Sequence, residues 1–168
     1  MQLLSPGRQI RQKNGGGGIM AIRFLRYEGD PILRQVSLPV RQVDSSIQKI
    51  LQDIADTLYN TPNGAGLSAN QVGILKRLIV VDTGTGLLQL ANPVVIDSRG
   101  EQECVEGCLS IPGRYGKTRR PQRVVVQALD ARGKSIFIPG EGELAKCLCH
   151  EIDHLDGILF TDRVFAWL

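Results

Sequence analysis

The motif His150-Glu151-Ile152-Asp153-His154 has the pattern H-E-x-x-H, and its two histidines are the only ones in the chain. Residues four apart on an α-helix lie on one face, so both imidazoles can bind one metal ion from the same side. Glu151 then lies close to the position that the metal leaves open, where a carboxylate can accept a proton from a bound water. The motif therefore predicts a catalytic metal site on a helix. The alternative is a solvent-exposed helix face that carries these residues by chance.

A catalytic metal usually has three protein ligands, and the chain has no third histidine. The third ligand must therefore be a cysteine, an aspartate or a glutamate. Cys147 precedes His154 by roughly 10 Å along a helix axis, which is too far for two bonds of ~2.0–2.3 Å to one ion. Cys149 points to a different face of the same helix. The best candidate is Cys108, because it follows Gly107 and glycine lets the backbone come close.

Three segments of the chain, in this order, resemble the motifs of the peptide deformylase family. Residues 64–71, with the sequence GAGLSANQ, are similar to G-x-G-x-A-A-x-Q. Residues 106–110 match E-G-C-L-S, and residues 150–154 match H-E-x-D-H. One H-E-x-x-H is weak evidence, whereas three ordered motifs are strong. The resemblance covers residues 20–164. It departs from the family at Ser68, where alanine is usual, and the serine places an additional hydroxyl near the expected substrate site.

The resemblance implies a metal-dependent hydrolase that removes the N-formyl group from the N-terminal methionine of newly made polypeptides and releases formate. Its metal would be held by Cys108, His150 and His154, with one ion per chain. The family implies Fe²⁺ in cells, which Zn²⁺, Ni²⁺ or Co²⁺ can replace. The ligand set alone does not decide the ion, because one cysteine with two histidines also suits Zn²⁺.

The resemblance also implies roles for residues around the metal. Glu151 would take a proton from the attacking water and pass it to the leaving amine. The Gln71 side-chain amide and the backbone N–H of Leu109 would stabilise the negative oxygen of the tetrahedral intermediate. The substrate is expected to contact a set of small residues, namely Gly64, Ala65, Gly66, Gly107 and Cys147.

Two other functions stay open from the sequence. A zinc peptidase that uses H-E-x-x-H usually has a further His or Glu ligand downstream, but only Asp156 and Asp162 follow His154 as acids. A non-catalytic member of the family would hold its metal for structure alone and leave Glu151 without a role. The second alternative predicts that substitution of Glu151 changes no function.

The composition favours one globular domain and excludes several classes of protein. A chain of 168 residues can bury a proper core. No apolar run approaches the ~20 residues needed to span a membrane, so no membrane contact is expected. Three of the 20 basic residues precede residue 20, which leaves 17 against the 17 acidic residues in the rest. Direct nucleic-acid binding through phosphate contacts is therefore not expected.

The four cysteines and the absence of a secretory signal favour a reducing compartment. We expect a bacterial cytoplasmic protein, with an organelle as the alternative. A structural zinc site of four cysteines is a second alternative, although the spacings C-x-x-x-C and C-x-C differ from the usual C-x-x-C pairs. The expected partners are N-formylmethionyl nascent peptides and, transiently, the ribosome. Some family members reach the ribosome through a longer C-terminal helix than the residues after Arg163 provide.

The sequence predicts two parts of the chain. Residues 1–19 are polar and contain four consecutive glycines, so we expect a disordered tail or a remnant of the expression vector, with a short organellar targeting segment as the alternative. Residues 20–168 are expected to form a single catalytic domain of the deformylase type.

Short strands with short turns indicate mainly antiparallel pairing. Together with the resemblance, they imply an α+β fold with small sheets packed around a central helix that carries the metal motif. Asp44 is a plausible N-cap for a first helix with one apolar face, and the last helix follows Gly140 and closes at Gly157. Strands are expected at residues 78–81, 87–90, 94–96, 101–105, 124–129 and 135–138. The basic stretch 114–123 is expected to be an exposed loop and strand edge, with Arg120 paired to Glu106 and supporting the loop of Cys108.

Overall fold

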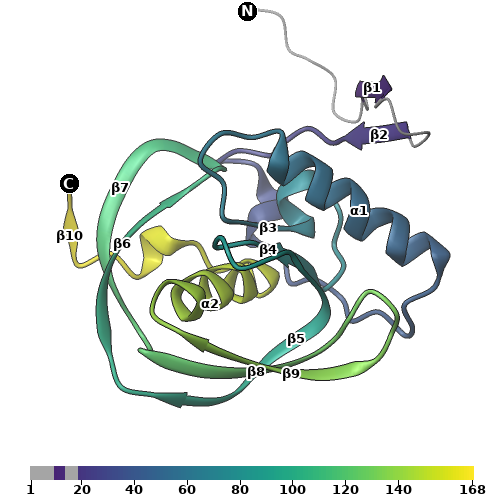
Figure 1. Ribbon diagram of the computed structural model, residues 1–168. Coiled ribbons are helices and arrows are strands. Elements are labelled where there is room, and N and C mark those ends of the chain that lie inside the picture. Colours follow the sequence, from purple (N-terminus) through teal and green to yellow (C-terminus); the bar gives the residue numbers. More distant parts are fainter. Residues whose placement is uncertain (1–9, 14–18) are drawn as a thin grey trace, which may run out of the picture.

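The computed structural model describes residues 10–13 and 19–168, with helix α2 at the centre (Figure 1). The α-helices are α1 (Ser45–Tyr59) and α2 (Glu143–Leu155), and the short 3-10 helices are η1 (Pro31–Arg34), η2 (Ala69–Val72) and η3 (Phe160–Asp162). The strands are β1 (Ile10–Lys13), β2 (Ile19–Ile22), β3 (Gly66–Ser68), β4 (Leu78–Val81), β5 (Leu88–Arg99), β6 (Gln102–Cys108), β7 (Ile111–Arg120), β8 (Arg123–Leu129), β9 (Ser135–Glu141) and β10 (Ala166–Trp167). The expected α+β class is confirmed.

The described strands form three antiparallel sheets. One has five strands in the order β3-β4-β5-β8-β9, and the second has three in the order β10-β7-β6. The third is the pair β1-β2. Most strands pair with a strand that is their neighbour in the sequence, across a short turn. The closely spaced apolar runs of the sequence predicted this antiparallel pairing. Strand β3 has a partner on one side only, so it is an edge of the five-stranded sheet.

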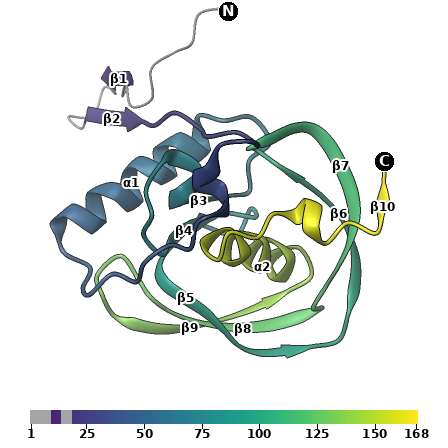
Figure 2. The same cartoon turned by 180° about the vertical axis from the view of Figure 1, so that it is seen from behind.

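Helix α2 lies inside the curve of strands β5, β8 and β9, with β6 and β7 beside it, and both views show this enclosure (Figure 2). Leu148 and Leu155 are fully buried among apolar residues of β4, β5, β8 and β9. The motif residues His150, Glu151 and His154 are buried as well. A solvent-exposed helix face is therefore not what these residues form.

Helix α1 follows the sequence expectation closely. The Asp44 side chain accepts a hydrogen bond from the backbone N–H of Ile47 at 2.9 Å, which is the predicted N-cap. Leu51, Ile54 and Leu58 are buried against β3 and β4 in a separate apolar cluster. The helix thereby supports, from behind, the strand that leads into Gln71.

Two strand predictions were wrong. Residues 88–90 and 94–96 belong to one strand, β5, whose pairing with β8 is irregular between Ala91 and Val94 and again before Asp97. Asn92 has a φ of 51°, so the chain kinks at Asn92 and Pro93 but does not stop. Residues 114–120 of the basic stretch belong to strand β7. Its buried face carries Thr118 and Arg120, and this polar face hid the usual alternation of apolar residues.

The predicted tail falls mostly outside the described residues. Residues 10–13 form β1, which pairs with β2, and Ile19 is the first residue of β2. The assignment of residues 20–168 to one catalytic domain stays a prediction. No helix in the described ranges is long and apolar enough to cross a membrane.

Gly157, just after α2, should tolerate alanine poorly. Its φ is 72°, and a Cβ there would lie 2.5 Å from the carbonyl oxygen of Arg34. Gly113 has a φ of 77° with no atom within 4 Å of such a Cβ, so it is a matched control for the backbone strain alone. We expect Gly113→Ala to cost about 1–2 kcal/mol of unfolding free energy and Gly157→Ala distinctly more, as measured by urea unfolding. Equal losses would contradict the close contact with Arg34.

Candidate active site

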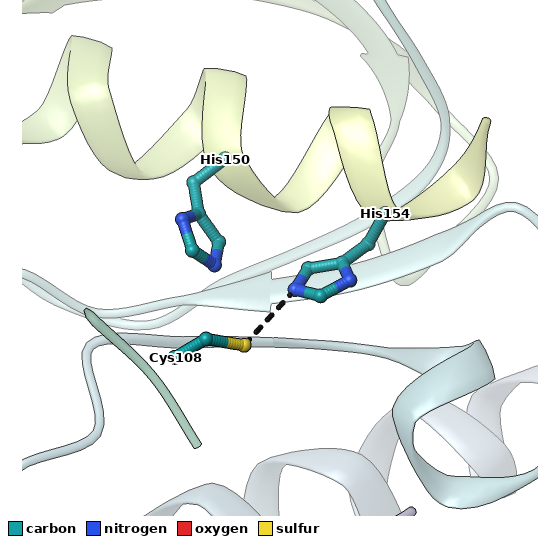
Figure 3. Close-up of side chains that lie close together, drawn as sticks. All are labelled: Cys108, His150 and His154. Carbon is teal, nitrogen blue, oxygen red and sulfur yellow. Dashed lines mark hydrogen bonds between the residues drawn. The ribbon is translucent and has the colours of Figure 1, made fainter. Parts of the chain in front are cut away.

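Three side chains from distant parts of the chain converge beneath helix α2 (Figure 3). His150 and His154 project from the helix toward Cys108, which ends strand β6. The Cys108 Sγ lies 3.3 Å from the His154 Nε2, and one ligand atom from each residue falls within 4.8 Å of the others. The structure thus brings together the three predicted metal ligands.

This cluster fits a metal ion. Metal–ligand bonds of ~2.0–2.3 Å in a tetrahedral site place ligand atoms roughly 3.3–3.8 Å apart, and the separation of Cys108 and His154 agrees. A thiol with two imidazoles leaves the fourth position for water, as in catalytic sites. The cluster contains one of the four cysteines, all of which are free, so a structural site of four cysteines does not form in the described chain.

A buried ionic network orients His150. Its Nδ1 lies 2.7 Å from the Glu106 Oε1, which leaves the opposite ring nitrogen for the metal. Arg120 donates to both oxygens of Glu106 at 2.8 Å, so the predicted pair is present. Burial opposes ionisation of Glu106, yet the hydrogen bonds and charges of Arg120 and His150 outweigh it and hold its pKa far below the usual value. Glu106 is therefore a carboxylate that fixes the imidazole.

The two imidazoles differ in their affinity for protons. Burial lowers the pKa of His150, but contacts with Cys108 and Glu106 raise it to about 10. Burial, helped by the neighbouring positive charge of His150, lowers the pKa of His154 well below its ordinary value. A metal ligand must be a neutral imidazole, so both histidines have to be neutral when a metal binds.

Glu151 lies in a narrow space behind the predicted substrate loop. A Cβ on Gly66 would lie 2.8 Å from the Glu151 Oε1 and 2.9 Å from the Cys147 Sγ, so only glycine allows this approach. The Glu151 Oε2 is buried without a hydrogen-bond partner among the described residues. Burial raises the pKa of Glu151 to about 7. A carboxyl in this state can both accept and give up a proton near neutral pH.

Gln71 lies on the other side of Cys108. Its Nε2 donates to the Ser110 Oγ at 3.0 Å and lies 3.5 Å from the Cys108 Sγ. Its Oε1 accepts from the backbone N–H of Ser68 at 3.0 Å and lies 2.9 Å from the Ser68 Oγ. The amide N–H groups of Gln71 therefore face the metal ligands. Ser68 is fully buried behind Gln71, so its hydroxyl contacts this side chain.

The remaining predicted site residues also lie near this centre. Gly64 packs against Leu109, because a Cβ on it would lie 3.1 Å from the Leu109 Cδ1. The Ala65 carbonyl accepts from the Cys147 Sγ at 3.5 Å. Gly107 leaves room for the Tyr115 ring, since a Cβ at this glycine would lie 2.7 Å from the Tyr115 Cε1. The small residues thus lie around the end of β6 that carries Cys108 and the part of α2 that carries Glu151.

Sequence reasoning missed several supporting residues. Thr118 donates to Glu106, and it precedes Arg120 by two on β7, so strand alternation could have placed both on one face. Arg163 donates twice to Asp153, which also accepts from Arg120 at 2.7 Å. No local pattern marks Arg163, because its partner lies on another element.

A family model for polypeptide deformylase matches residues 22–166. The chain belongs to the polypeptide deformylase family. Peptide deformylase 2 of Clostridium acetobutylicum is 56% identical over 149 residues, which are 89% of this chain and 99% of the relative. The activity of the chain is therefore metal-dependent hydrolysis that removes the N-formyl group from N-terminal methionine and releases formate. Its substrates are formylated nascent peptides, and the peptidase alternative is set aside.

Solved deformylases have the same fold. The peptide deformylase of Legionella pneumophila aligns with a TM-score of 0.81 and 44% identity over 86% of each chain. That of Acinetobacter baumannii, solved with Met-Ala-Ser bound, aligns with a TM-score of 0.81 and 27% identity over 85% of this chain and 98% of that one. The α+β architecture around α2 is therefore that of known deformylases.

Removal of the Arg120 guanidinium should destabilise the deformylase strongly. Arg120→Met would leave Glu106 buried with too few partners, a situation that costs about 3–5 kcal/mol. Metal affinity should fall about 10–100-fold, because His150 loses its fixed support. Arg123→Met, which breaks an exposed pair with Glu141, is the control and should change stability by at most about 0.5 kcal/mol. Urea unfolding and metal titration measure both, and similar results for the two variants would contradict the role of the network.

Proposed function

We propose that Cys108, His150 and His154 hold the catalytic metal of this deformylase and that the ion is Fe²⁺. The convergence of these three ligand atoms beside a buried carboxylate is the observation that carries the proposal. When bound, the metal supplies a Lewis acid that makes hydroxide available near neutral pH. The three ligands also suit Zn²⁺, so they do not identify the ion. We choose Fe²⁺ because the family resemblance implies it.

Glu151 moves the proton in the proposed reaction. Its unpaired Oε2 is buried, so the carboxylate has an acceptor that no neighbouring protein group among the described residues occupies. It accepts the proton of the attacking water and then delivers it to the amine that leaves. Gly66 leaves the space that this side chain occupies, because a Cβ at this position would lie 2.8 Å from the Glu151 Oε1.

Gln71 and Leu109 are the proposed donors to the oxyanion. The carbon of the formyl group becomes tetrahedral during attack, and its oxygen gains negative charge. The Gln71 Nε2 faces the metal ligands, and the backbone N–H of Leu109 directly follows Cys108 in the chain. Two such donors stabilise the developing charge more than the neutral ground state.

The substrate peptide is proposed to bind along β3. This strand is an edge of its sheet, and an extended peptide can add to such an edge through backbone hydrogen bonds. Gly66 faces Glu151 there, while Gly64, Ala65, Gly107 and Cys147 provide small side chains around the entering residue. The narrow space favours formyl, the smallest acyl group, over acetyl. The Met-Ala-Ser bound to the Acinetobacter baumannii enzyme is a peptide that begins with methionine, as a product of this reaction would.

We also propose that the enzyme works in the bacterial cytoplasm, where new chains emerge, and contacts the ribosome transiently. Formylated nascent peptides are the substrates of the family, and they become available in the cytoplasm as they leave the ribosome. The location and the ribosome contact are both inferred from where the substrate occurs, and no binding surface for the ribosome is used in the argument.

The activity should be specific for the formyl group. With protein purified without oxygen and loaded with Fe²⁺, we expect formate release from N-formylmethionyl dipeptides and no acetate release from the N-acetyl analogues. Quantification of both acids in parallel measures the selectivity. Folded, metal-loaded protein that releases no formate would contradict the assignment.

Glu151→Gln should separate metal binding from turnover. The amide cannot accept the proton, so kcat should fall at least about 10²–10⁴-fold, while the bound metal per chain stays unchanged. Glu143→Gln on the exposed first turn of α2 is the matched control and should keep full activity. Metal analysis and formate release are measured on each variant. Retained activity in Glu151→Gln would favour a non-catalytic role for this residue.

A further inference from the structure

We propose that Ser68 is a positioning residue, which fixes the side-chain amide of Gln71 in the orientation that the reaction needs. The inference rests on the proposed role of Gln71 as an oxyanion donor. It concerns how this chain holds that donor, and it is carried by the hydrogen bonds around two fully buried side chains.

The Gln71 amide has distinct surroundings at its two ends. The oxygen end meets the backbone N–H of Ser68 at 3.0 Å and the Ser68 Oγ at 2.9 Å. The nitrogen end donates to the Ser110 Oγ at 3.0 Å and faces the Cys108 Sγ. Both donors on the oxygen side come from one residue, so Ser68 determines which end of the amide points to the metal ligands.

This control matters in the present chain because a side-chain amide rotates easily. The terminal torsion of glutamine has broad, roughly two-fold preferences, so the two flipped forms are close in intrinsic energy. In the flipped form the amide oxygen would face the oxyanion and repel it. The backbone N–H of Ser68 can only donate, so it opposes this flip. The hydroxyl hydrogen, which is within reach of both the Gln71 Oε1 and the Asn70 Oδ1, adds a second donor when it points to Gln71.

The hydroxyl also joins Gln71 to the metal-binding helix. The Ser68 Oγ lies 2.7 Å from the Asn70 Oδ1, and the Asn70 Nδ2 donates to the His154 carbonyl oxygen at 2.7 Å. The side chains of Ser68, Asn70 and Gln71 are all buried, so water does not reach them to replace a lost hydrogen bond. The single hydroxyl hydrogen is shared between the Gln71 Oε1 and the Asn70 Oδ1, and through Asn70 it links the oxyanion donor to the end of α2 that carries His154.

The first test is Ser68→Ala in the metal-loaded enzyme. We expect kcat for an N-formylmethionyl dipeptide to fall about three- to tenfold, while KM changes less than about twofold, because the bond acts mainly on transition-state charge. Ser37→Ala is the matched control, since the Ser37 Oγ is buried without a hydrogen-bond partner among the described residues. The control should keep the original kcat. Circular dichroism and metal content confirm that each variant is folded and loaded.

The second test is a double-mutant cycle with Gln71→Ala. If Ser68 acts through Gln71, Ser68→Ala should lower kcat in the original enzyme and have almost no effect when Gln71 is already alanine. An equal loss in both backgrounds would show that Ser68 acts by another route and would overturn the proposal. The cycle also separates the link through Asn70, because that link persists in both backgrounds.

A readout independent of turnover is the NMR signal of the Gln71 side-chain amide in Zn²⁺-loaded protein, assigned by its loss in Gln71→Ala. We expect one sharp pair of amide protons, which shifts or broadens in Ser68→Ala and not in Ser37→Ala. An unchanged signal together with unchanged kcat in Ser68→Ala would overturn the positioning role. If Gln71→Ala itself keeps full kcat, the oxyanion role of Gln71 has failed instead, and the two failures are thus distinguished.

Discussion

The buried carboxylate of Glu106 is the interaction on which the rest of the structure depends. It accepts two hydrogen bonds from Arg120 and one from Thr118, and it lies 2.7 Å from the His150 Nδ1. A carboxylate out of water is costly unless such partners surround it. These partners come from β7 and α2, so the same charge joins the three-stranded sheet to the central helix and orients a metal ligand.

Close approach is the second constraint, and small residues meet it. Gly66 allows β3 to lie against Glu151 and Cys147, and Gly107 allows the Cys108 strand end to lie against Tyr115. A larger residue at Gly66 would separate β3 from the helix, and one at Gly107 would collide with Tyr115 of β7. The distance between β3 and α2 therefore depends on the absence of a side chain at Gly66.

Prediction from sequence succeeded where the signal was local. Helix α1 follows from an N-cap at Asp44 and an apolar face, and α2 from its motif and Gly157. It failed for β7, because Arg120 occupies a buried position where an apolar residue is usual and its compensating partner, Glu106, is fourteen residues away. It also divided β5 at Asn92, where a local kink is absorbed by pairing with β8. Long-range partners decided both cases.

The sequence by itself determined the chemistry. Two histidines one helical turn apart, a glutamate between them and three ordered motifs specify a metal hydrolase, because residue type and local spacing are written in the chain. Only the tertiary structure decided how the parts are held. It brought the Cys108 Sγ within 3.3 Å of His154 and set Ser68 behind Gln71. The first contact joins segments that are dozens of residues apart, and the second depends on the rotation of a side chain. Both are determined by packing in the folded protein, and no periodicity in the sequence encodes them.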